Sequence, residues 1–358
     1  MPLPAASQVG ASTKKQIRVA AFTGGTNISS PRFRVRQYIP QMEEYGVHVS
    51  EYVARWRSWP PAAKLWRPLW LPATLMDRLP GVVSSFRTDV TLLQREIVST
   101  MVTLERFTHR PRVLDVDDAV WLNRGGQRNF AKLIGLCDGV ICGNSFIQEN
   151  VRRWCSESMV LPTAVDTGRF HPLPDSAGHS TRPIIGWSGL GSNLASLAAI
   201  ERPLAAVLDS HKDAVLRVVS DVKPTFQLLR ESQVEYVRWA PENEVRTIQE
   251  MSIGLMPMED SLWSRGKCSY KMLLYMACGV AVAVSPVGMN NEVLSVGNVG
   301  FGPKSDAEWS DSLTSLLDNP VKAKEMGQAG RKVVEENYSL RSLTPRFAGY
   351  LRKFAGNS

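Results

Sequence analysis

The sequence predicts an α/β protein made of two Rossmann-like domains, each built on a doubly wound parallel sheet, that face one another across a cleft. The chain has 358 residues, which is too long for one ordinary hydrophobic core. Short β-branched segments alternate with helical patterns in two successive series. A stretch rich in Pro, Asp, Ser, Gly and His at 171–182 separates the two series.

The expected organisation has five parts. They are a flexible N-terminus at 1–15, a first domain at 16–170, a linker at 171–182, a second domain at 183–335, and a C-terminal helix at 336–358 that returns toward the first domain. The N-terminus lacks the charged start and apolar core of a signal peptide, and the chain has no run of eighteen apolar residues. We therefore expect a cytoplasmic protein.

Composition and charge narrow the classes of partner. Apolar residues make up 44% and charged residues 21% of the chain, an ordinary globular balance. The net charge of +8 favours anionic partners, namely phosphates, nucleic acid or an anionic membrane surface. The five cysteines show no paired metal spacing, so we expect reduced core thiols and no metal site.

The first domain begins as strand, glycine loop, helix and strand. A strand at 17–22 leads into a loop with Gly24 and Gly25, and a second strand follows at 47–49. Gly-x-Gly-x-x-Gly is absent, so the dinucleotide fingerprint is not met. The later elements expected are a weak strand at 82–85, strands at 90–96, 112–121, 139–142 and 159–163, and helices at 97–107, 130–136 and 145–154.

The segment 52–80 reads as an insertion of distinct character. Four of the ten tryptophans, Trp56, Trp59, Trp66 and Trp70, interleave here with Arg, Lys and Pro. Aromatic and basic side chains together suit an anionic membrane interface, and they also suit stacking on a single-stranded nucleic acid. These side chains are explained equally well by an insertion that packs on the domain and extends its cationic ends into solvent. We expect no nucleic-acid partner, and the other two interpretations stay open.

The second domain repeats the alternation of strand and helix. Strands are expected at 184–187, 215–219, 234–237, 253–256, 280–284 and 300–302, with helices between them and a mostly helical segment at 306–354. Ligands of such sheets bind at the carboxyl ends of the strands, and pockets favour domain interfaces.

The stretch 265–288 carries the strongest chemical signal. A loop with Arg265, Gly266 and Lys267 leads into an apolar helix, Gly279 ends that helix, and a strand follows. Side-chain cations beside a helix N-terminus with free N–H groups form a place to hold a diphosphate. Lys267 and Lys271 share a helix face if both are helical. The alternative is two solvated lysines on a surface helix.

Four motifs in order along the chain resemble the GT-B glycosyltransferases, and most closely their retaining family 4. They are Ser30-Pro31-Arg32-Phe33-Arg34-Val35 with Tyr38, the hinge Leu161-Pro162-Thr163-Ala164-Val165-Asp166-Thr167-Gly168-Arg169-Phe170, Ile185-Gly186-Trp187-Ser188-Gly189, and Gly266-Lys267-Cys268-x-x-Lys271 ahead of Met276-Ala277 and Ser285-Pro286-Val287-Gly288. The resemblance covers 17–350 except 52–80.

This resemblance implies a nucleotide-diphosphate sugar as donor in the C-terminal half and a glycan or lipid-linked acceptor in the N-terminal half. It also implies that no cofactor is required, and it suggests a role in bacterial cell-surface polysaccharide or glycolipid synthesis. The family usually carries two glutamates eight residues apart, where this chain has Gly266 and Leu274. A catalytically silent homologue that binds a nucleotide sugar or a protein is therefore the alternative.

For the donor we expect the cations Arg265, Lys267 and Lys271 to hold the departing diphosphate. Glycines let the backbone approach phosphates, and Trp187 stacks on the donor or packs in the core. The expected donor-binding residues are Gly24, Gly25, Trp187, Gly189, Gly191, Arg265, Gly266, Gly288 and Glu292. The alternatives to donor binding are that Gly25 lies in an ordinary turn and that Glu292 caps a helix.

Asp117 and Asp118 form the sharpest acidic pair, because they follow a strand at the edge of the expected cleft. Either carboxylate would bind the acceptor hydroxyl or take its proton, so we name both as catalytic, together with Lys267 and Lys271. Two alternatives remain. Asp115-x-Asp117 could bind a divalent ion, because its spacing matches a carboxylate motif for such ions. Asp117 and Asp118 could instead have a structural role, as a helix cap or as partners of an arginine.

Overall fold

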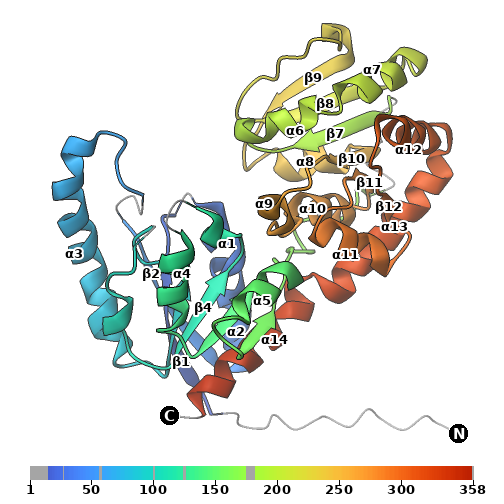
Figure 1. The fold of residues 1–358 in the computed structure, drawn as a ribbon. Helices are drawn as coiled ribbons and strands as arrows, with labels where there is room; N and C mark the ends of the chain where they lie inside the picture. The colour runs from blue at the N-terminus through green and yellow to red at the C-terminus, as the bar shows by residue number, and fades with distance from the viewer. Residues whose placement is uncertain are drawn as a thin grey trace, which may run out of the picture.

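The chain forms two α/β domains, each centred on a six-stranded parallel sheet, as the sequence predicts (Figure 1). The computed structural model describes residues 15–26, 28–55, 59–99, 101–123, 126–174 and 182–356. All of the expected flexible N-terminus except Lys15, and most of the expected linker, lie outside the described residues.

The first sheet has the order β2-β1-β3-β4-β5-β6, so the chain switches direction across the sheet between β1 and β3. Its strands are β1 (Ile17–Thr23), β2 (Val47–Val53), β3 (Val90–Gln94), β4 (Arg112–Val116), β5 (Gly139–Cys142) and β6 (Ser158–Val160). Its helices are α1 (Ser29–Arg34), α2 (Ile39–Met42), α3 (Arg67–Ser85), α4 (Gly126–Ile134) and α5 (Ser145–Val151). Every residue of β3, β4 and β5 is buried, as expected for a parallel sheet covered on both faces.

The second sheet has the order β12-β11-β10-β7-β8-β9. Its strands are β7 (Ile184–Ser188), β8 (Val215–Ser220), β9 (Val234–Arg238), β10 (Ile253–Met256), β11 (Ala281–Val284) and β12 (Gly300–Phe301). The helices are α6 (Leu194–Ala198), α7 (Glu201–Ser210), α8 (Glu244–Gln249), α9 (Leu262–Arg265), α10 (Tyr270–Ala277), α11 (Met289–Val296), α12 (Asp306–Asp318) and α13 (Pro320–Asn337). Gly279 follows the end of α10 with φ +73°, a conformation that glycine adopts at little cost.

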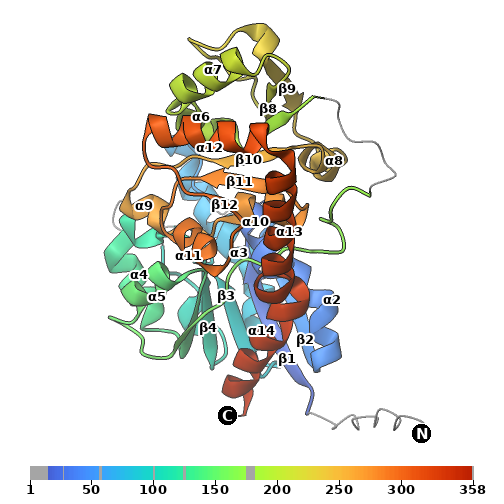
Figure 2. The ribbon, with the colours of Figure 1, turned by 90° about the vertical axis from the view of Figure 1, so that its right-hand side faces the viewer.

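The C-terminal helix α14 (Leu340–Ala355) leaves the second domain and packs beside the first sheet (Figure 2). Its Phe347 and Leu351 share an apolar core with Val19 of β1. The chain therefore crosses between the domains twice. The two crossings are hydrogen-bonded to one another, because Val165 N–H donates to Tyr338 O over 2.8 Å and Leu340 N–H donates to Val165 O over 3.0 Å.

Three local predictions are wrong. The strand expected at 112–121 ends at Val116, and Val120–Leu122 form a 3₁₀ turn. Residues 82–85 form the last turn of α3 instead of a strand, because Gly81, Val82 and Ser85 belong to the buried face of that helix. The described residues of 97–107 form an isolated bridge and a short 3₁₀ turn instead of a helix. The buried Glu105 carboxylate accepts the N–H groups of Ile97 and Thr103, and these bonds hold the backbone in a loop.

A buried ion pair lies beneath the carboxyl edge of the first sheet. Arg34 of α1 is 1% exposed, and its Nη2 lies 2.6 Å from Oδ1 of the fully buried Asp115 on β4. Arg34 Nη1 also donates to Leu161 O over 2.7 Å. One guanidinium thus joins a helix, a central strand and the hinge that leads toward the second domain.

Replacing Arg34 by Met should lower the free energy of unfolding by about 3–5 kcal/mol, because Asp115 would keep a buried charge without a partner. The exposed pair Arg18–Asp89 is the control, and Arg18→Met should cost under about 1 kcal/mol. Guanidinium chloride unfolding followed by circular dichroism measures both. Equal small losses in the two variants would contradict the role given to this pair.

Candidate functional site: a cleft between the two sheets

A cleft of about 430 Å³ opens where the carboxyl edges of the two sheets face one another. Its wall from the first domain includes Ser30, Phe33, Asp117, Asp118 and Thr163, and its wall from the second domain includes Trp187, Asn193, Lys267, Ser269 and Lys271. Both walls are built from residues at or just beyond strand ends and helix starts, where ligands of parallel sheets bind. The volume is within the usual range for small-molecule sites.

The loop 265–270 of the second domain is docked directly on the first domain. Asn144, the N-cap of α5, donates from Nδ2 to Arg265 O over 3.1 Å and to Lys267 O over 2.9 Å. The Cys268 thiol donates to Asp117 O over 3.1 Å. The rings of Phe33 and Tyr270 lie 4.3 Å apart. The cationic loop is therefore held against the edge of the first sheet.

Asp117 and Asp118 are held by arginine. Arg95, which has φ +62°, donates to Asp117 Oδ1 over 2.8 Å and to Asp118 Oδ2 over 2.5 Å. Ser30 Oγ also donates to Asp117, and Lys267 Nζ lies 3.4 Å from Asp118. Burial alone would raise the pKa of Asp117, but Arg95 and Arg34 outweigh it and hold that pKa below its usual range. A carboxylate that stays ionised is a weak proton acceptor, so this geometry favours the arginine-partner interpretation.

Lys271 has a different environment. Its ammonium lies 4.3 Å from the ring centre of Trp187, and among the described residues no acidic side chain pairs with it. A Cβ added to Gly189 would lie 2.3 Å from Nζ, so the ammonium lies over the glycine loop after β7. Burial lowers the pKa of Lys271 to about 8, and the positive charge of Lys267 adds to the effect. This is a desolvated cation that an anion would stabilise.

Ser269 is a cleft residue that our sequence reasoning missed. It is the N-cap of α10 in the left-handed region, with φ +51°, and its buried hydroxyl has no hydrogen-bond partner among the described residues. The first-turn N–H groups of α10 have no partners within the helix, and Lys271 lies in the same turn. A serine directly before an apolar helix is an N-cap signal, so the sequence did carry a hint.

The structure brings only part of the expected set into the cleft. Asp117, Asp118, Trp187, Lys267 and Lys271 line it, and Gly189 lies against Lys271. The other expected residues have neighbours of their own. In the first domain, Gly24 lines a separate pocket and Gly25 faces Ala54 O. In the second domain, Gly266 packs on Ala119 and Gly288 packs on the Arg265 backbone. The remaining three have polar partners: Gly191 N–H donates to Asp221, Arg265 pairs with Asp260, and Glu292 accepts from Ser145.

Leu274, which stands where the resembling family has a glutamate, is 7% exposed and belongs to the apolar core of the second domain.

A second cavity of about 730 Å³ adjoins the cleft and shares Ser196, Pro257 and Met258 with it. Within the part of the chain that the structure describes, no three His, Cys, Asp or Glu side chains are grouped to hold a metal ion. Among the same residues, no helix combines the length and apolarity needed to span a bilayer.

No protein-family model and no curated protein sequence matches the chain. Solved structures do match over nearly its whole length. Sucrose-phosphate synthase from Thermosynechococcus elongatus superposes with a TM-score of 0.71 at 14% identity, covering 96% of this chain and 100% of that one. A glycosyltransferase from Rickettsia africae gives 0.68 at 12% identity, covering 96% and 100%. HepE of Anabaena in complex with UDP and glucose gives 0.67 at 12% identity, covering 95% and 100%.

The fold is that of the GT-B glycosyltransferases. The fold that the four sequence motifs implied is thereby confirmed, although identity between this chain and the matching structures is low. The cleft that holds Lys271 lies between the two Rossmann-like domains of this fold.

Asn144→Asp should loosen the docking of the cationic loop, because it keeps the carbonyl-type oxygen that caps α5 but replaces the amide that donates to Arg265 and Lys267. We expect hydrogen exchange at 265–270 to accelerate by about tenfold or more, because two hydrogen bonds of about 0.5–1.5 kcal/mol each are lost. Asn319→Asp, which alters a cap of α13, is the control and should leave 265–270 unchanged. Unchanged exchange in Asn144→Asp would argue against the docked loop.

Proposed function

We propose that this chain is a retaining glycosyltransferase that moves a sugar from a nucleotide-diphosphate sugar to a glycan or lipid-linked acceptor. The observation that carries the proposal is Lys271, a desolvated ammonium that faces the interdomain cleft and has no carboxylate partner among the residues that the structure describes. A diphosphate would supply the missing counter-charge. The first turn of α10 would add its N–H groups, and Ser269 would add a hydroxyl that has no partner within the described part of the chain.

In the proposed reaction the bond between the anomeric carbon and the diphosphate oxygen breaks, and its electron pair leaves with the diphosphate. The acceptor oxygen forms its bond to the same carbon, and its proton passes to the departing diphosphate. Lys271, with Lys267 beside it, would neutralise the charge that develops on the leaving group. Retention of the anomeric configuration is inferred from the motif resemblance alone. No cofactor is assigned.

The neighbourhood of the cleft has room for the rest of the donor. The adjoining cavity of about 730 Å³ meets the cleft at Ser196, Pro257 and Met258, which is where a nucleoside would continue from a diphosphate held by Lys271. Solved structures of HepE contain UDP and UDP-glucose, and one of TarM contains UDP with glycan-type ligands. These neighbours support a nucleotide-sugar donor for this chain as well.

A silent homologue that binds a nucleotide sugar without turnover is the second candidate, and the burial of Leu274 is the observation that favours it. Without a carboxylate at this position, the ribose would need other partners. Hydrolysis of UDP- and GDP-sugars, with and without membrane and glycan extracts as acceptor, separates the two candidates. Binding without any turnover would favour the silent homologue.

UDP affinity should fall as the pH rises above about 8, because only protonated Lys271 attracts the diphosphate and its pKa in the free protein is about 8. Binding raises that pKa, so affinity is fully developed below pH 8 and declines by up to about tenfold per pH unit above it. Isothermal titration calorimetry across pH 7–10 measures this decline.

Lys271→Met should weaken UDP binding by about tenfold or more and should remove the decline in affinity above pH 8. Lys322→Met is the matched control, because Lys322 also lies over an aromatic ring, that of Phe301, and lines neither the cleft nor the adjoining cavity. Wild-type affinity in Lys271→Met would remove the phosphate assignment. Thermal stabilisation by NAD, with none by UDP or GDP, would overturn the choice of a glycosyltransferase.

We further propose that the enzyme acts at the cytoplasmic face of an anionic membrane, to which α3 binds. This helix forms the outer edge of the first domain (Figure 1). The solvent side of α3 and of the turns that flank it is largely apolar, with Leu65 85% exposed and Met76 69% exposed. This apolar face of α3 comprises Leu69, Met76, Leu79 and Val83 on the helix, Leu65 and Trp66 just before it, and Phe86 just after it. The alternative of a fully packed insertion does not account for so many exposed apolar side chains.

Charge favours a lipid surface over a second copy of the chain. Lys64 and Arg67 flank one end of the apolar face and Arg87 flanks the other, whereas Asp77, the one acidic residue of 64–87, accepts the backbone N–H of Arg55. Two copies packed along α3 would bring cations together in either orientation. An anionic bilayer would meet the same cations with phosphates and the apolar face with acyl chains.

Replacing Leu65, Leu69 and Met76 by Ser should abolish co-sedimentation with vesicles of phosphatidylglycerol and phosphatidylethanolamine, because each buried side chain contributes about 1.5–3 kcal/mol. The control replaces Leu228, Leu262 and Val321, exposed apolar residues of the second domain, and should still bind. No vesicle binding by the wild type would contradict the membrane proposal. Concentration-dependent dimers lost in the α3 variant would assign this face to a second copy.

A further inference from the structure

Lys267 is a cation that joins the two walls of the cleft. Its backbone belongs to the second domain, in the loop before α10, but its ammonium lies 3.4 Å from Oδ1 of Asp118 in the first domain. Among the described residues, Asp118 is the only carboxylate that pairs with it. Lys271 has no such partner in the same part of the chain, so the two cleft lysines begin from different electrostatic states.

The contact between Lys267 and Asp118 is loose. Its length of 3.4 Å exceeds the usual N–H···O hydrogen-bond length of about 2.7–3.2 Å. The Lys267 side chain is 37% exposed, and its ammonium lies 5.0 Å from the ring centre of Trp263, so water can reach it. An ion pair that is partly exposed and imperfect in geometry contributes little, and a ligand with more negative charge would displace it readily.

Asp118 would keep a partner if Lys267 moved away. Arg95 donates to Asp118 Oδ2 over 2.5 Å, which is the carboxylate oxygen that Lys267 does not contact. The carboxylate would therefore stay paired with a cation. The large penalty for leaving a charge without a partner in a partly buried site would not arise.

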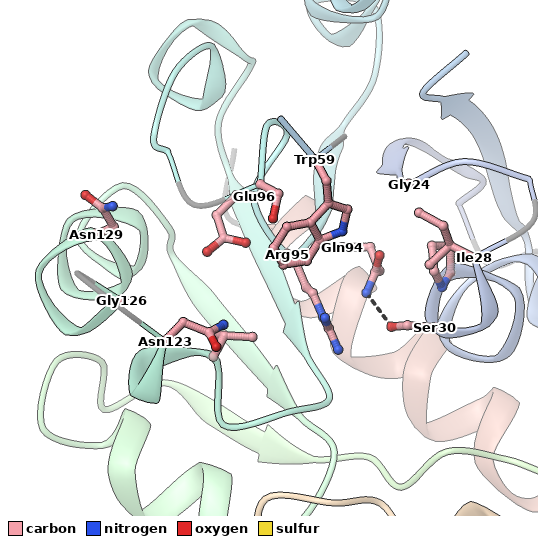
Figure 3. Close-up of a pocket in the computed structure, with 13 residues that line it drawn as sticks. Gly24, Ile28, Ser30, Trp59, Gln94, Arg95, Glu96, Asn123, Gly126 and Asn129 are labelled. Carbon is pink, nitrogen blue, oxygen red and sulfur yellow. Dashed lines mark hydrogen bonds between the residues drawn. The ribbon is translucent and has the colours of Figure 1, made fainter. Parts of the chain in front are cut away.

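Arg95 is held in place by its own neighbours in the first domain. Its Nε donates to Asp117 Oδ1 over 2.8 Å. Ser30 donates to the other oxygen of Asp117, and Gln94 donates to Ser30 over 2.8 Å (Figure 3). All of these groups belong to the first domain, so this wall of the cleft does not depend on Lys267 for its arrangement.

The backbone around Lys267 is also held independently of its ammonium. Asn144 Nδ2 donates to the carbonyl oxygens of Arg265 and Lys267. The Cys268 thiol donates to the carbonyl oxygen of Asp117. Because these bonds do not involve the Lys267 ammonium, that group can change partners by a side-chain movement while the two domains stay docked.

We propose that Asp118 and the donor diphosphate compete for Lys267. In the free protein, Asp118 offsets the charge of Lys267, so that two lysines lie in one cleft without a ligand. A diphosphate carries more negative charge than one carboxylate, so it takes Lys267 over while Arg95 keeps Asp118 paired. When the nucleoside diphosphate leaves, Asp118 takes Lys267 back.

Asp118 thus acts as a positioning residue, because it affects the diphosphate through Lys267 and lowers its affinity for the site. Lower affinity favours release of the nucleoside diphosphate after transfer. This inference rests on the proposed transferase function and adds to it a control of donor and product affinity at the same site.

A double-mutant cycle on UDP affinity, measured by isothermal titration calorimetry at neutral pH, tests the competition. Asp118→Asn should bind UDP about two- to fivefold more tightly than the wild type, because the competing charge is gone. Asp118→Ser should show the same gain, so a folding defect in one variant leaves the other as the test. In a Lys267→Met background, neither substitution should change UDP affinity. Asp89→Asn, which removes a carboxylate from an exposed ion pair of the first domain, should not change it either.

The outcomes separate this competition from the proposed function. UDP binding by Asp118→Asn and Asp118→Ser that equals or falls below that of the wild type would overturn the competition and leave the donor assignment standing. A gain that persists in the Lys267→Met background would also overturn it, because the gain would then come from the general field of the removed charge. A wild-type protein that does not bind UDP would overturn both.

Discussion

The organisation of the cleft depends on the buried ion pair between Arg34 and Asp115. Two desolvated charges are tolerated there because the guanidinium is bonded both to the carboxylate and to the carbonyl of Leu161, so that little of its donor capacity is unused. The pair fixes α1 against β4 and the hinge. It thereby positions Ser30 at one end of α1 and Asp117 just beyond β4, and these two side chains meet on the wall of the cleft.

The same principle explains why the two sides of the cleft differ in charge. On the first-domain side, acidic groups already have cationic partners, since Arg95 holds both Asp117 and Asp118. On the second-domain side, Lys271 has an aromatic ring for a neighbour and no carboxylate among the described residues. In this cleft the acidic groups are neutralised by arginine and lysine, whereas the desolvated ammonium of Lys271 faces the cleft without a counter-charge among the described residues. Such a site favours binding of an anion, and this asymmetry supports the proposal of a phosphate-bearing donor.

Sequence reasoning predicted the parts of the fold that depend on local pattern. Alternating β-branched runs identified both sheets, and Gly279 marked the end of α10. It failed where distant contacts decide, as at 97–107, where the carboxylate of Glu105 holds a loop. The helix face that Lys267 and Lys271 were expected to share does not form, because α10 begins at Tyr270 and Lys267 lies in the loop before it. The contacts of Arg95 with Asp117 and Asp118 were not predictable, because they depend on strand ends that meet only in the folded sheet.

The central claim is that Lys271 holds the diphosphate of a nucleotide sugar between the two domains. A crystal structure of the protein with UDP tests it most directly. The account predicts a diphosphate oxygen within hydrogen-bonding distance of Lys271 Nζ, close to the first turn of α10, with the nucleoside extending toward Ser196 and Met258. A UDP molecule bound elsewhere, or one whose phosphates leave Lys271 without contact, would contradict it.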